Sequence, residues 1–305
     1  MQTSELIKRQ IQSADKLLSV VKTMKILAKV SIRQYELAVE SLGDYYRTVE
    51  MGMQIVLRQY QIATFAFPEK RKKRTIGVIV FGAGQGMCGR FNELISDHFT
   101  EKVRDYDADE FKMIALGRRT MASLGERGWS VDDYFEVPGS IGGINKIIQD
   151  ILLQIENWKE IEGINDILLF HHKPVSGTTY APRMQQLLPL DPQWLEHLSK
   201  KKWETRMLPA YTMSPEKIFK SLVRQYIFVS LYRSFAESLA SEHSSRLTAM
   251  QAAEKKIDER LDQLNINYRN QRQRAITEEV LDIMSGYEAS KSGRDIKLYG
   301  SNKSS

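Results

Sequence analysis

The chain has 305 residues, 42% hydrophobic composition and a net charge of +6, which is enough for one compact domain plus extended elements. It has no run of about 18 apolar residues, which argues against a membrane-spanning helix. Its single cysteine, Cys88, excludes an internal disulfide and fits a reducing compartment. Residues 1–5 lead directly into a helical pattern without room for a signal or transit peptide, so we expect a cytoplasmic protein.

Residues 1–64 are predicted to form a long helix. Its apolar and small side chains recur at steps of mostly four and three, which is typical of a left-handed coiled coil. This seam consists of Ile7, Ile11, Ala14, Leu18, Val21, Met24, Ala28, Ser31, Tyr35, Ala38, Leu42 and Tyr45. Gly43 and Gly52 fall late in the pattern, where a helix tolerates them at modest cost. Residues 1–33 carry seven Lys or Arg against two acidic residues, which indicates an acidic partner.

The middle of the chain has a different pattern. Pro68 and an all-basic run at residues 70–74 indicate a linker over residues 65–75. Residues 76–208 then alternate between the two element types: strands at 76–81, 111–116, 167–172 and, as a further candidate, 184–190, and helices at 91–104, 118–127 and 144–158. This alternation predicts a mostly parallel sheet with helices on its faces, that is, a central Rossmann-like α/β domain.

Residues 209–286 provide a second long helix. The 70 residues from 216 to 285 contain neither Gly nor Pro, and at about 1.5 Å per residue they would span roughly 105 Å. Ser214 is placed to cap this helix and Pro215 to occupy its first position. Its stripe consists of Ile218, Leu222, Tyr226, Val229, Tyr232, Phe235, Leu239, Leu247, Met250, Ala253, Ile257, Leu261, Leu264, Tyr268, Ile276, Val280 and Ile283. We expect the two terminal helices to pair as a long antiparallel coiled coil, and residues 287–305 to form a polar, mobile tail.

A glycine-rich turn follows the first strand. Its sequence, Gly84-Gln85-Gly86-Met87-Cys88-Gly89, is the GxGxxG string of dinucleotide-binding proteins. The second strand, however, runs into Gly117, Arg118 and Arg119 instead of an acidic residue, so an oxidoreductase would have to use NADP, with an arginine receiving the 2′-phosphate. The simpler interpretation is a strand-to-helix turn that needs positive φ and close backbone approach.

Other chemistry has weaker support. Cys88 resembles a nucleophile elbow, but Arg90 stands where the final glycine should be. The five histidines have no signature spacing, and His171 and His172 should point to opposite faces of their strand. Zinc and calcium motifs are absent from the sequence. A nucleic-acid-binding role fits the basic first helix and the pI near 9.1, although no nucleic-acid fold motif occurs. We therefore expect no catalytic residue, no metal and no cofactor.

Three separated parts of the sequence resemble the gamma subunit of F-type ATP synthase, in the order of that family. The first helix contributes Lys22-Thr23-Met24-Lys25-Ile26 with Ala28, and the turn contributes Cys88-Gly89-Arg90-Phe91-Asn92. The second helix contributes Glu237-Ser238-Leu239-Ala240-Ser241-Glu242-His243 with Arg246 and Ala249-Met250, then Tyr268, Asn270, Arg272-Gln273, Ala275-Ile276-Thr277-Glu278-Glu279 and residues 283–286.

The resemblance implies a central rotor subunit without an active site of its own. Its partners would be three alpha and three beta subunits around one copy of this chain, an epsilon subunit and the membrane c-ring, with no nucleic acid, at the cytoplasmic face of the bacterial inner membrane. The residues implied to touch the catalytic collar are Met24, Lys25, Arg246, Gln273 and Thr277. Residues 30–36 depart from the family pattern and 19 residues follow Gly286, so we expect a divergent or alternative form.

Overall fold

The computed structural model describes residues 2–59, 74–203, 209 and 211–300, which divide into two compact units. One unit contains residues 25–249, and the other contains residues 1–24 and 250–305. Two long helices belong partly to each unit: α1 (Gln2–Gln59) and α6 (Pro215–Gly300). Most of the predicted linker at 65–75 lies outside the described residues. Over the part of the chain that is described, no helix is long and apolar enough to cross a membrane.

The unit of residues 25–249 is built around a five-stranded sheet. Its strands are β1 (Thr75–Phe81), β2 (Glu110–Leu116), β3 (Asp133–Phe135), β4 (Asp166–Ser176) and β5 (Thr179–Leu188), in the order β3-β2-β1-β4-β5. β1 is parallel to β2 and β4, β3 is parallel to β2, and only β5 runs antiparallel, in a hairpin with β4. The prediction of a mostly parallel sheet is confirmed.

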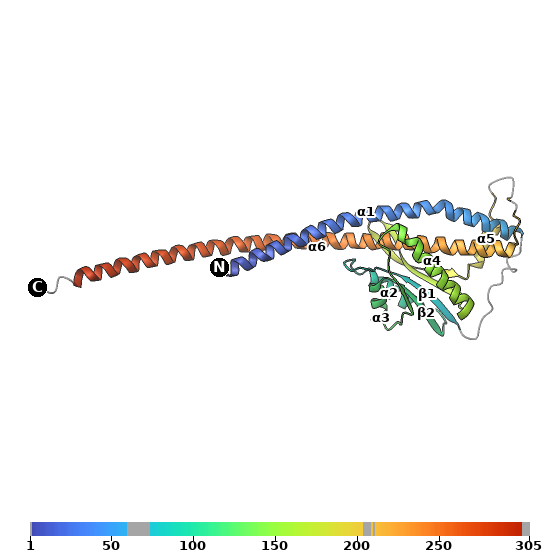
Figure 1. Cartoon of the computed structure of the whole chain (residues 1–305), viewed down its shortest axis with the longest axis horizontal. Coiled ribbons are helices and arrows are strands. Elements are labelled where there is room, and N and C mark those ends of the chain that lie inside the picture. The colour runs from blue at the N-terminus through green and yellow to red at the C-terminus, as the bar shows by residue number, and fades with distance from the viewer. Residues whose placement is uncertain (1, 60–73, 204–208, 210, 301–305) are drawn as a thin grey trace. The chain divides into compact units, whose positions relative to one another are not determined.

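Helices cover both faces of this sheet, as expected for parallel strands. Ile76, Val78 and Val80 pack in one core cluster with residues of α2 (Phe91–Val103) and α3 (Arg118–Gly125). Ile79 and Phe81 belong to a second cluster with α1, α4 (Ile141–Asn157), α5 (Pro192–Lys200) and α6. The alternation along β1 therefore directs successive side chains to different helical layers. Figure 1 shows the ribbons of α2 and α3 next to those of β1 and β2. A π-helical turn, η2 (Trp158–Glu162), ends α4.

Within the same unit, α1 and α6 run antiparallel. Tyr35 stacks on His243 with ring centroids 5.7 Å apart, and Tyr46 lies 6.0 Å from Tyr226. Higher numbers on α1 thus meet lower numbers on α6, which confirms the predicted direction of pairing. The seam prediction also holds along most of α1, because Ile7, Ile11, Ala14, Leu18 and Val21 are each less exposed than their neighbours.

Two details of the helices were predicted wrongly. Tyr45 is 43% exposed, whereas Tyr46 and then Val49 turn inward, because a straight helix drifts away from a 3.5-residue repeat. The C-terminal helix does not end at Gly286 but continues to Gly300, so residues 287–300 are helical. A glycine costs a helix only about 1 kcal/mol relative to alanine, and it ends one only where its backbone turns left-handed.

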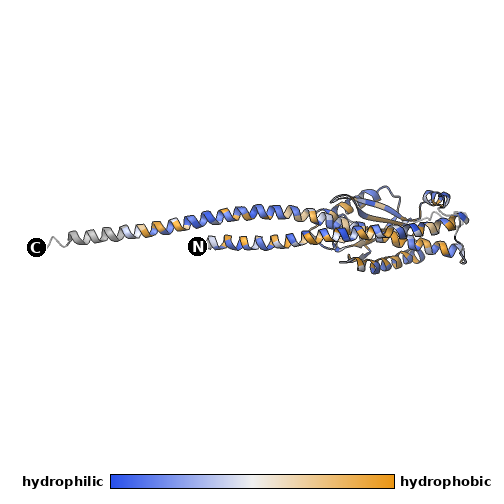
Figure 2. Cartoon of the chain, turned by 90° about the horizontal axis from the view of Figure 1, so that it is seen from above, coloured by the Kyte–Doolittle hydropathy of each residue, from blue (hydrophilic) through white to orange (hydrophobic). Residues whose placement is uncertain are grey.

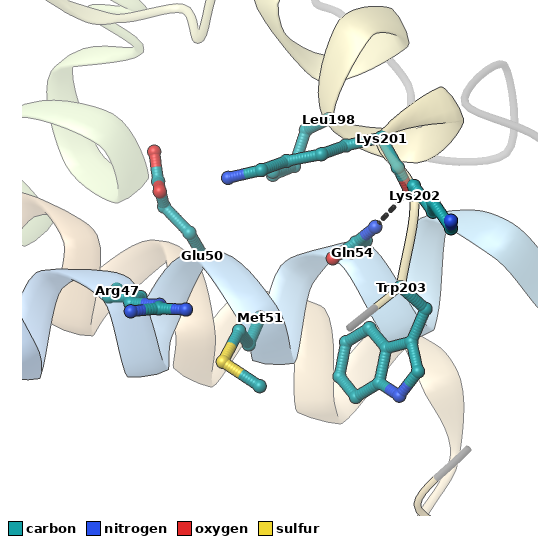
Figure 3. A pocket seen from close by; sticks show the side chains of 8 residues that line it. All are labelled: Arg47, Glu50, Met51, Gln54, Leu198, Lys201, Lys202 and Trp203. Carbon is teal, nitrogen blue, oxygen red and sulfur yellow. Dashed lines mark hydrogen bonds between the residues drawn. The ribbon is translucent and has the colours of Figure 1, made fainter. Parts of the chain in front are cut away.

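Hydrogen bonds join the C-terminal end of α5 to side chains of α1. This helix was not predicted from the sequence. Gln54 donates to the main-chain carbonyl of Lys201 (Figure 3). Arg58 donates to the same carbonyl and, at 3.3 Å, to the carbonyl of Ser199. The last carbonyls of a helix lack intrahelical partners, so these side chains satisfy them. The N-terminal end of α5 is capped by Asp191, whose carboxylate accepts from the Gln193 amide at 2.9 Å.

The two glycines of α1 give a direct test of its packing. A β-carbon at Gly43 would have no neighbour within 4 Å, whereas one at Gly52 would lie 2.7 Å from a methyl group of Leu222. We predict that Gly43→Ala raises the free energy of unfolding by about 0.5–1 kcal/mol, because alanine loses less backbone entropy in a helix. Gly52→Ala should show a smaller gain or a loss, because Leu222 must move. Urea unfolding followed by circular dichroism measures both; equal gains would contradict the packing of α1 on α6.

Candidate functional site

The glycine-rich turn after β1 is bound to α6. The Ser245 hydroxyl donates to the main-chain carbonyl of Cys88 at 2.6 Å, and the Tyr180 hydroxyl donates to Ser245 at 2.9 Å. Gly89 has φ of +58°, and a β-carbon there would lie 3.5 Å from the Ser245 oxygen. The positive φ of Gly89 therefore favours glycine, as the simpler interpretation predicted, whereas a β-carbon at this distance would make only ordinary van der Waals contact with α6.

Cys88 is not placed for nucleophilic chemistry. Its side chain is buried, and burial raises its pKa to about 11, with the carboxylate of Glu242 acting in the same direction. Only the thiolate is a strong nucleophile, so this thiol is inert near neutral pH. Its hydrogen-bonding partners are the Gln85 carbonyl at 3.6 Å and the Asn92 amide at 3.9 Å.

His171 and His172 on β4 point to opposite faces of the sheet, as predicted. His171 Nε2 lies 3.1 Å from a carboxylate oxygen of Glu237 on α6. His172 stacks on Phe91 of α2 at 4.2 Å and meets Tyr180 edge-on. Both nitrogens of His172 lack a hydrogen-bond partner, and burial lowers its pKa to about 3.

A buried charged cluster joins β4 to α6. The two carboxylate oxygens of Glu237 accept separately, one from His171 and the other from Arg233 at 2.8 Å. The side chain of His171 is 1% exposed and that of Glu237 is 6% exposed. Burial raises the pKa of Glu237, but the hydrogen bonds from His171 and Arg233 outweigh it and hold the pKa below its usual value. Burial lowers the pKa of His171, so a neutral ring donates its Nε2 proton to Glu237.

A second buried ion pair lies within α6, two turns further along. Arg246 Nη2 donates to Glu242 at 2.5 Å, and the two side chains are 11% and 7% exposed. Arg246 also contacts His243 Nδ1 at 3.2 Å, and His243 stacks on Tyr35 of α1. Burial raises the pKa of Glu242 despite its partner, and burial lowers the pKa of His243 to about 4.

The five residues predicted to touch a partner are divided between the two units. Met24 is half-buried at a seam position of α1, and Gln273 and Thr277 are exposed one turn apart on α6, with the Thr277 hydroxyl donating to the Gln273 carbonyl at 2.9 Å. Lys25 and Arg246 belong to the other unit, where Lys25 is half-buried and Arg246 is held by Glu242. Their role in binding a partner stays a prediction.

The end of α6 exposes apolar side chains in regular positions. Ile276 is 51% exposed, Val280 50%, Ile283 66% and Tyr287 70%. They recur at steps of four and three, so they lie on one side of the helix, with Gln273 at the edge of this stripe. Figure 2 shows hydrophobic residues in this part of α6. We call Ile276, Val280, Ile283 and Tyr287 the exposed stripe. A helical surface of this kind suits contact with another chain.

The comparisons with known proteins agree with this arrangement. A profile of the ATP synthase family matches residues 3–289. The ATP synthase gamma chain of Halothermothrix orenii is 30% identical over 303 residues, covering 95% of this chain and 100% of that one. This chain belongs to the ATP synthase gamma-chain family. The gamma chain of Alkaliphilus metalliredigens is 28% identical over 295 residues, covering 93% of this chain and 98% of the relative.

Solved structures extend the gamma-chain fold to this protein. A chain of the Euglena gracilis mitochondrial ATP synthase, in a structure of OSCP, F1 and the c-ring, matches with a TM-score of 0.66 at 13% identity and 96% coverage of both chains. A chain of the Tetrahymena thermophila central stalk and c-ring matches with a TM-score of 0.55 at 19% identity, covering 77% of this chain and 99% of that one. Neither the NADP interpretation of the turn nor the nucleic-acid interpretation finds support in these comparisons.

Membership in the gamma-chain family does not explain every buried group. From the sequence we placed His171 and His172 on opposite faces of their strand, but we did not identify Glu237 as the partner of His171 and did not single out Ser245. The available signal was two adjacent histidines in an otherwise apolar strand, which demand polar partners when buried. The partner of His171 lies 66 residues away along the chain, so sequence spacing could not identify it.

The hydrogen bond between Ser245 and the turn can be tested with the single cysteine. In Ser245→Ala the Cys88 carbonyl loses one donor and keeps the Phe91 amide at 3.3 Å, so the cost is about 0.5–1.5 kcal/mol, and the turn should open more often. We predict faster reaction of Cys88 with a thiol reagent at pH 8. Ser244→Ala is the matched control, because the Ser244 hydroxyl bonds only to Ala240 of its own helix. Equal rates in the two variants would contradict the tie between the turn and α6.

His172 should make the stability of the protein fall in mild acid. Its pKa is near 3 in the folded state and near 6.5 when unfolded, so as pH falls below 6.5 the unfolded chain gains a proton that the folded chain cannot accept. The loss is about 1.4 kcal/mol per pH unit, or about 2 kcal/mol at pH 5. His172→Leu should flatten the dependence between pH 7 and pH 5 by this amount in urea titrations. An unchanged slope would show that His172 is accessible to protons.

His243 and Glu242 also titrate in this region, with opposite signs. The lowered pKa of His243 removes stability as pH falls below 6.5, whereas the raised pKa of Glu242 adds stability as pH falls through that pKa. Both effects are present in the native protein and in His172→Leu, so the difference between the two isolates His172.

Proposed function

We propose that this chain is the central rotor shaft of an F-type ATP synthase. One copy would stand inside a collar of three alpha and three beta subunits, with an epsilon subunit and the membrane c-ring at its other end, at the cytoplasmic face of a bacterial inner membrane. The family and the fold support this proposal. The observation that carries it is the exposed stripe at the end of α6, which has no partner within the described chain.

The exposed stripe and the asymmetry of the chain together suggest the mechanism. A single shaft cannot contact three catalytic subunits identically, so it biases each of them toward a different conformation and nucleotide affinity. As the shaft turns, each beta subunit passes through the same states in succession. The chemistry of ATP takes place on the collar, and this chain supplies only a rotating, asymmetric surface.

The predicted contact residues fit this proposal in different ways. Gln273 and Thr277 are exposed beside the stripe and can reach a partner directly. Arg246 is largely buried by its own Glu242, so it would meet the collar only through its 11% exposed surface. Its main effect would be to hold α6 in shape at that level, because a buried ion pair is costly to break.

Co-expression with alpha and beta subunits tests the proposal. We predict that this chain co-purifies with both and that the complex hydrolyses ATP faster and with stronger cooperativity than alpha and beta alone. Ile276→Gln combined with Val280→Gln should weaken incorporation and lower turnover without changing the thermal stability of the free chain, because both side chains are already exposed.

Asp282→Asn is the matched control, since residue 282 is also exposed and lies on the other side of α6 from the stripe. It should assemble and turn over like the native chain. A collar that excludes the native chain, or one whose activity is indifferent to the stripe, would refute the rotor proposal.

A further inference from the structure

One stretch of α6, residues 234–245, presents a smooth surface to the rest of the unit of residues 25–249. Between residues 234 and 245 nearly every side chain is buried, and most are small. The buried small residues are Ser234, Ala236, Ser238, Ala240, Ser241, Ser244 and Ser245. Several of these hydroxyls bond back to α6 itself: Ser241 donates to the Glu237 carbonyl and Ser244 to the Ala240 carbonyl. These hydrogen bonds stay within α6 and therefore add little to its attachment to neighbouring elements.

A smooth helical surface resists displacement poorly. Helices lock together when large side chains project into holes between residues of the neighbour, and serines and alanines form only shallow ridges. Apolar burial itself is non-directional, so it favours contact without fixing the position of the helix along or about its axis. In this stretch the register of α6 must come from other groups.

Directional contacts from α6 to the sheet side occur at three levels. Phe235 packs edge-on against Phe81 at 4.6 Å, which is an apolar contact. Ser245 donates to the Cys88 carbonyl in the turn and accepts from the neutral hydroxyl of Tyr180 on β5 at 2.9 Å. Between these two levels, a carboxylate oxygen of Glu237 lies 3.1 Å from Nε2 of His171 in the middle of β4. Arg233, one turn earlier on α6, donates to the other carboxylate oxygen and orients it. The bond between Glu237 and His171 is a charge-assisted bond to the sheet itself, and such bonds are stronger and more directional than neutral ones.

We propose that His171 and Glu237 are positioning residues that fix α6 to the sheet, so that the head and the shaft rotate together. This inference rests on the proposed rotor function and deepens it. Torque applied to the head tends to turn the sheet around α6, and the bridge opposes that motion because any rotation of α6 separates Glu237 from His171. Without the hydrogen bond between His171 and Glu237, part of each rotational step would be lost as movement of α6 against the sheet.

The chain provides its own matched control. His171 and His172 are adjacent and equally buried, but only His171 reaches α6, whereas His172 contacts α2 and β5. Leucine at either position removes a buried imidazole, and only at position 171 does it break the bridge. His171→Gln restores a side-chain N–H donor for Glu237 and serves as the conservative rescue.

The test uses the complete ATP synthase containing this chain, in inverted membrane vesicles. ATP hydrolysis and ATP-driven uptake of the coupling ion are measured together, with a pH-sensitive dye for protons and labelled sodium for sodium ions. We expect His171→Leu to lower the ions transported per ATP by about twofold or more, because Glu237 then keeps only Arg233 of its own helix and α6 loses its charge-assisted bond to the sheet. His172→Leu should keep the native ratio, and His171→Gln should recover it.

Hydrogen exchange of the free full-length chain provides the second measurement. Amides of residues 234–245 should exchange faster in His171→Leu than in His172→Leu. A native transport ratio in His171→Leu, or an equal loss in both leucine variants, would overturn the proposal even though the native enzyme works. Failure of the native chain to support any ATP-driven transport would instead overturn the rotor function, and the exchange result would then still decide whether the bridge positions α6.

Discussion

One constraint shapes this protein: α6 is 86 residues long. Along all of that length, its apolar side chains must either pack against other elements or remain in contact with water. Its surroundings change along its length. From Phe219 to Leu247 most side chains are buried or half-buried, from Met250 to Tyr268 only a narrow seam is covered, and from Arg272 to Tyr287 every residue is exposed. The helix is continuous, but its burial decreases in stages between Phe219 and Tyr287.

The part of α6 between Phe219 and Leu247 combines small residues with buried ions. Small side chains allow a helix to approach its neighbours closely, but they provide few interlocking contacts. Glu237 and Glu242 lie among them. Each pairs with an arginine four residues away on α6: Glu237 with Arg233, which precedes it, and Glu242 with Arg246, which follows it. A buried ion pair is a poor source of net stability, because desolvation offsets most of the attraction. What such a pair contributes is a contact of fixed direction, which suits a helix that, in the proposed function, must keep its position when torque acts on it.

Periodicity predicted most of the fold, and long-range pairing accounts for most of what it could not predict. The seam from Ile7 to Leu42 and the strands at 76–81 and 111–116 follow from local spacing alone. β3 was missed because three residues carry too little pattern, and α5 because it is short, although Asp191 before Pro192 is a recognisable helix start. The roles of the residues named by resemblance stay predictions, and the sequence could not show that Arg246 pairs with Glu242 or that His171 reaches Glu237.

The exposed stripe is the clearest physical reason why this chain is incomplete by itself. Residues 272–287 have no tertiary packing to support their helix, and isolated helices of that length are marginal in water. Their apolar side chains remain in contact with water, at a cost of roughly 25 cal/mol for each Å² of apolar surface that a partner could cover. A permanent, fully packed interface would recover that energy but would also hold the shaft in one orientation. A stripe with polar neighbours such as Gln273 and Thr277 recovers only part of it, as the proposed rotation of the shaft requires.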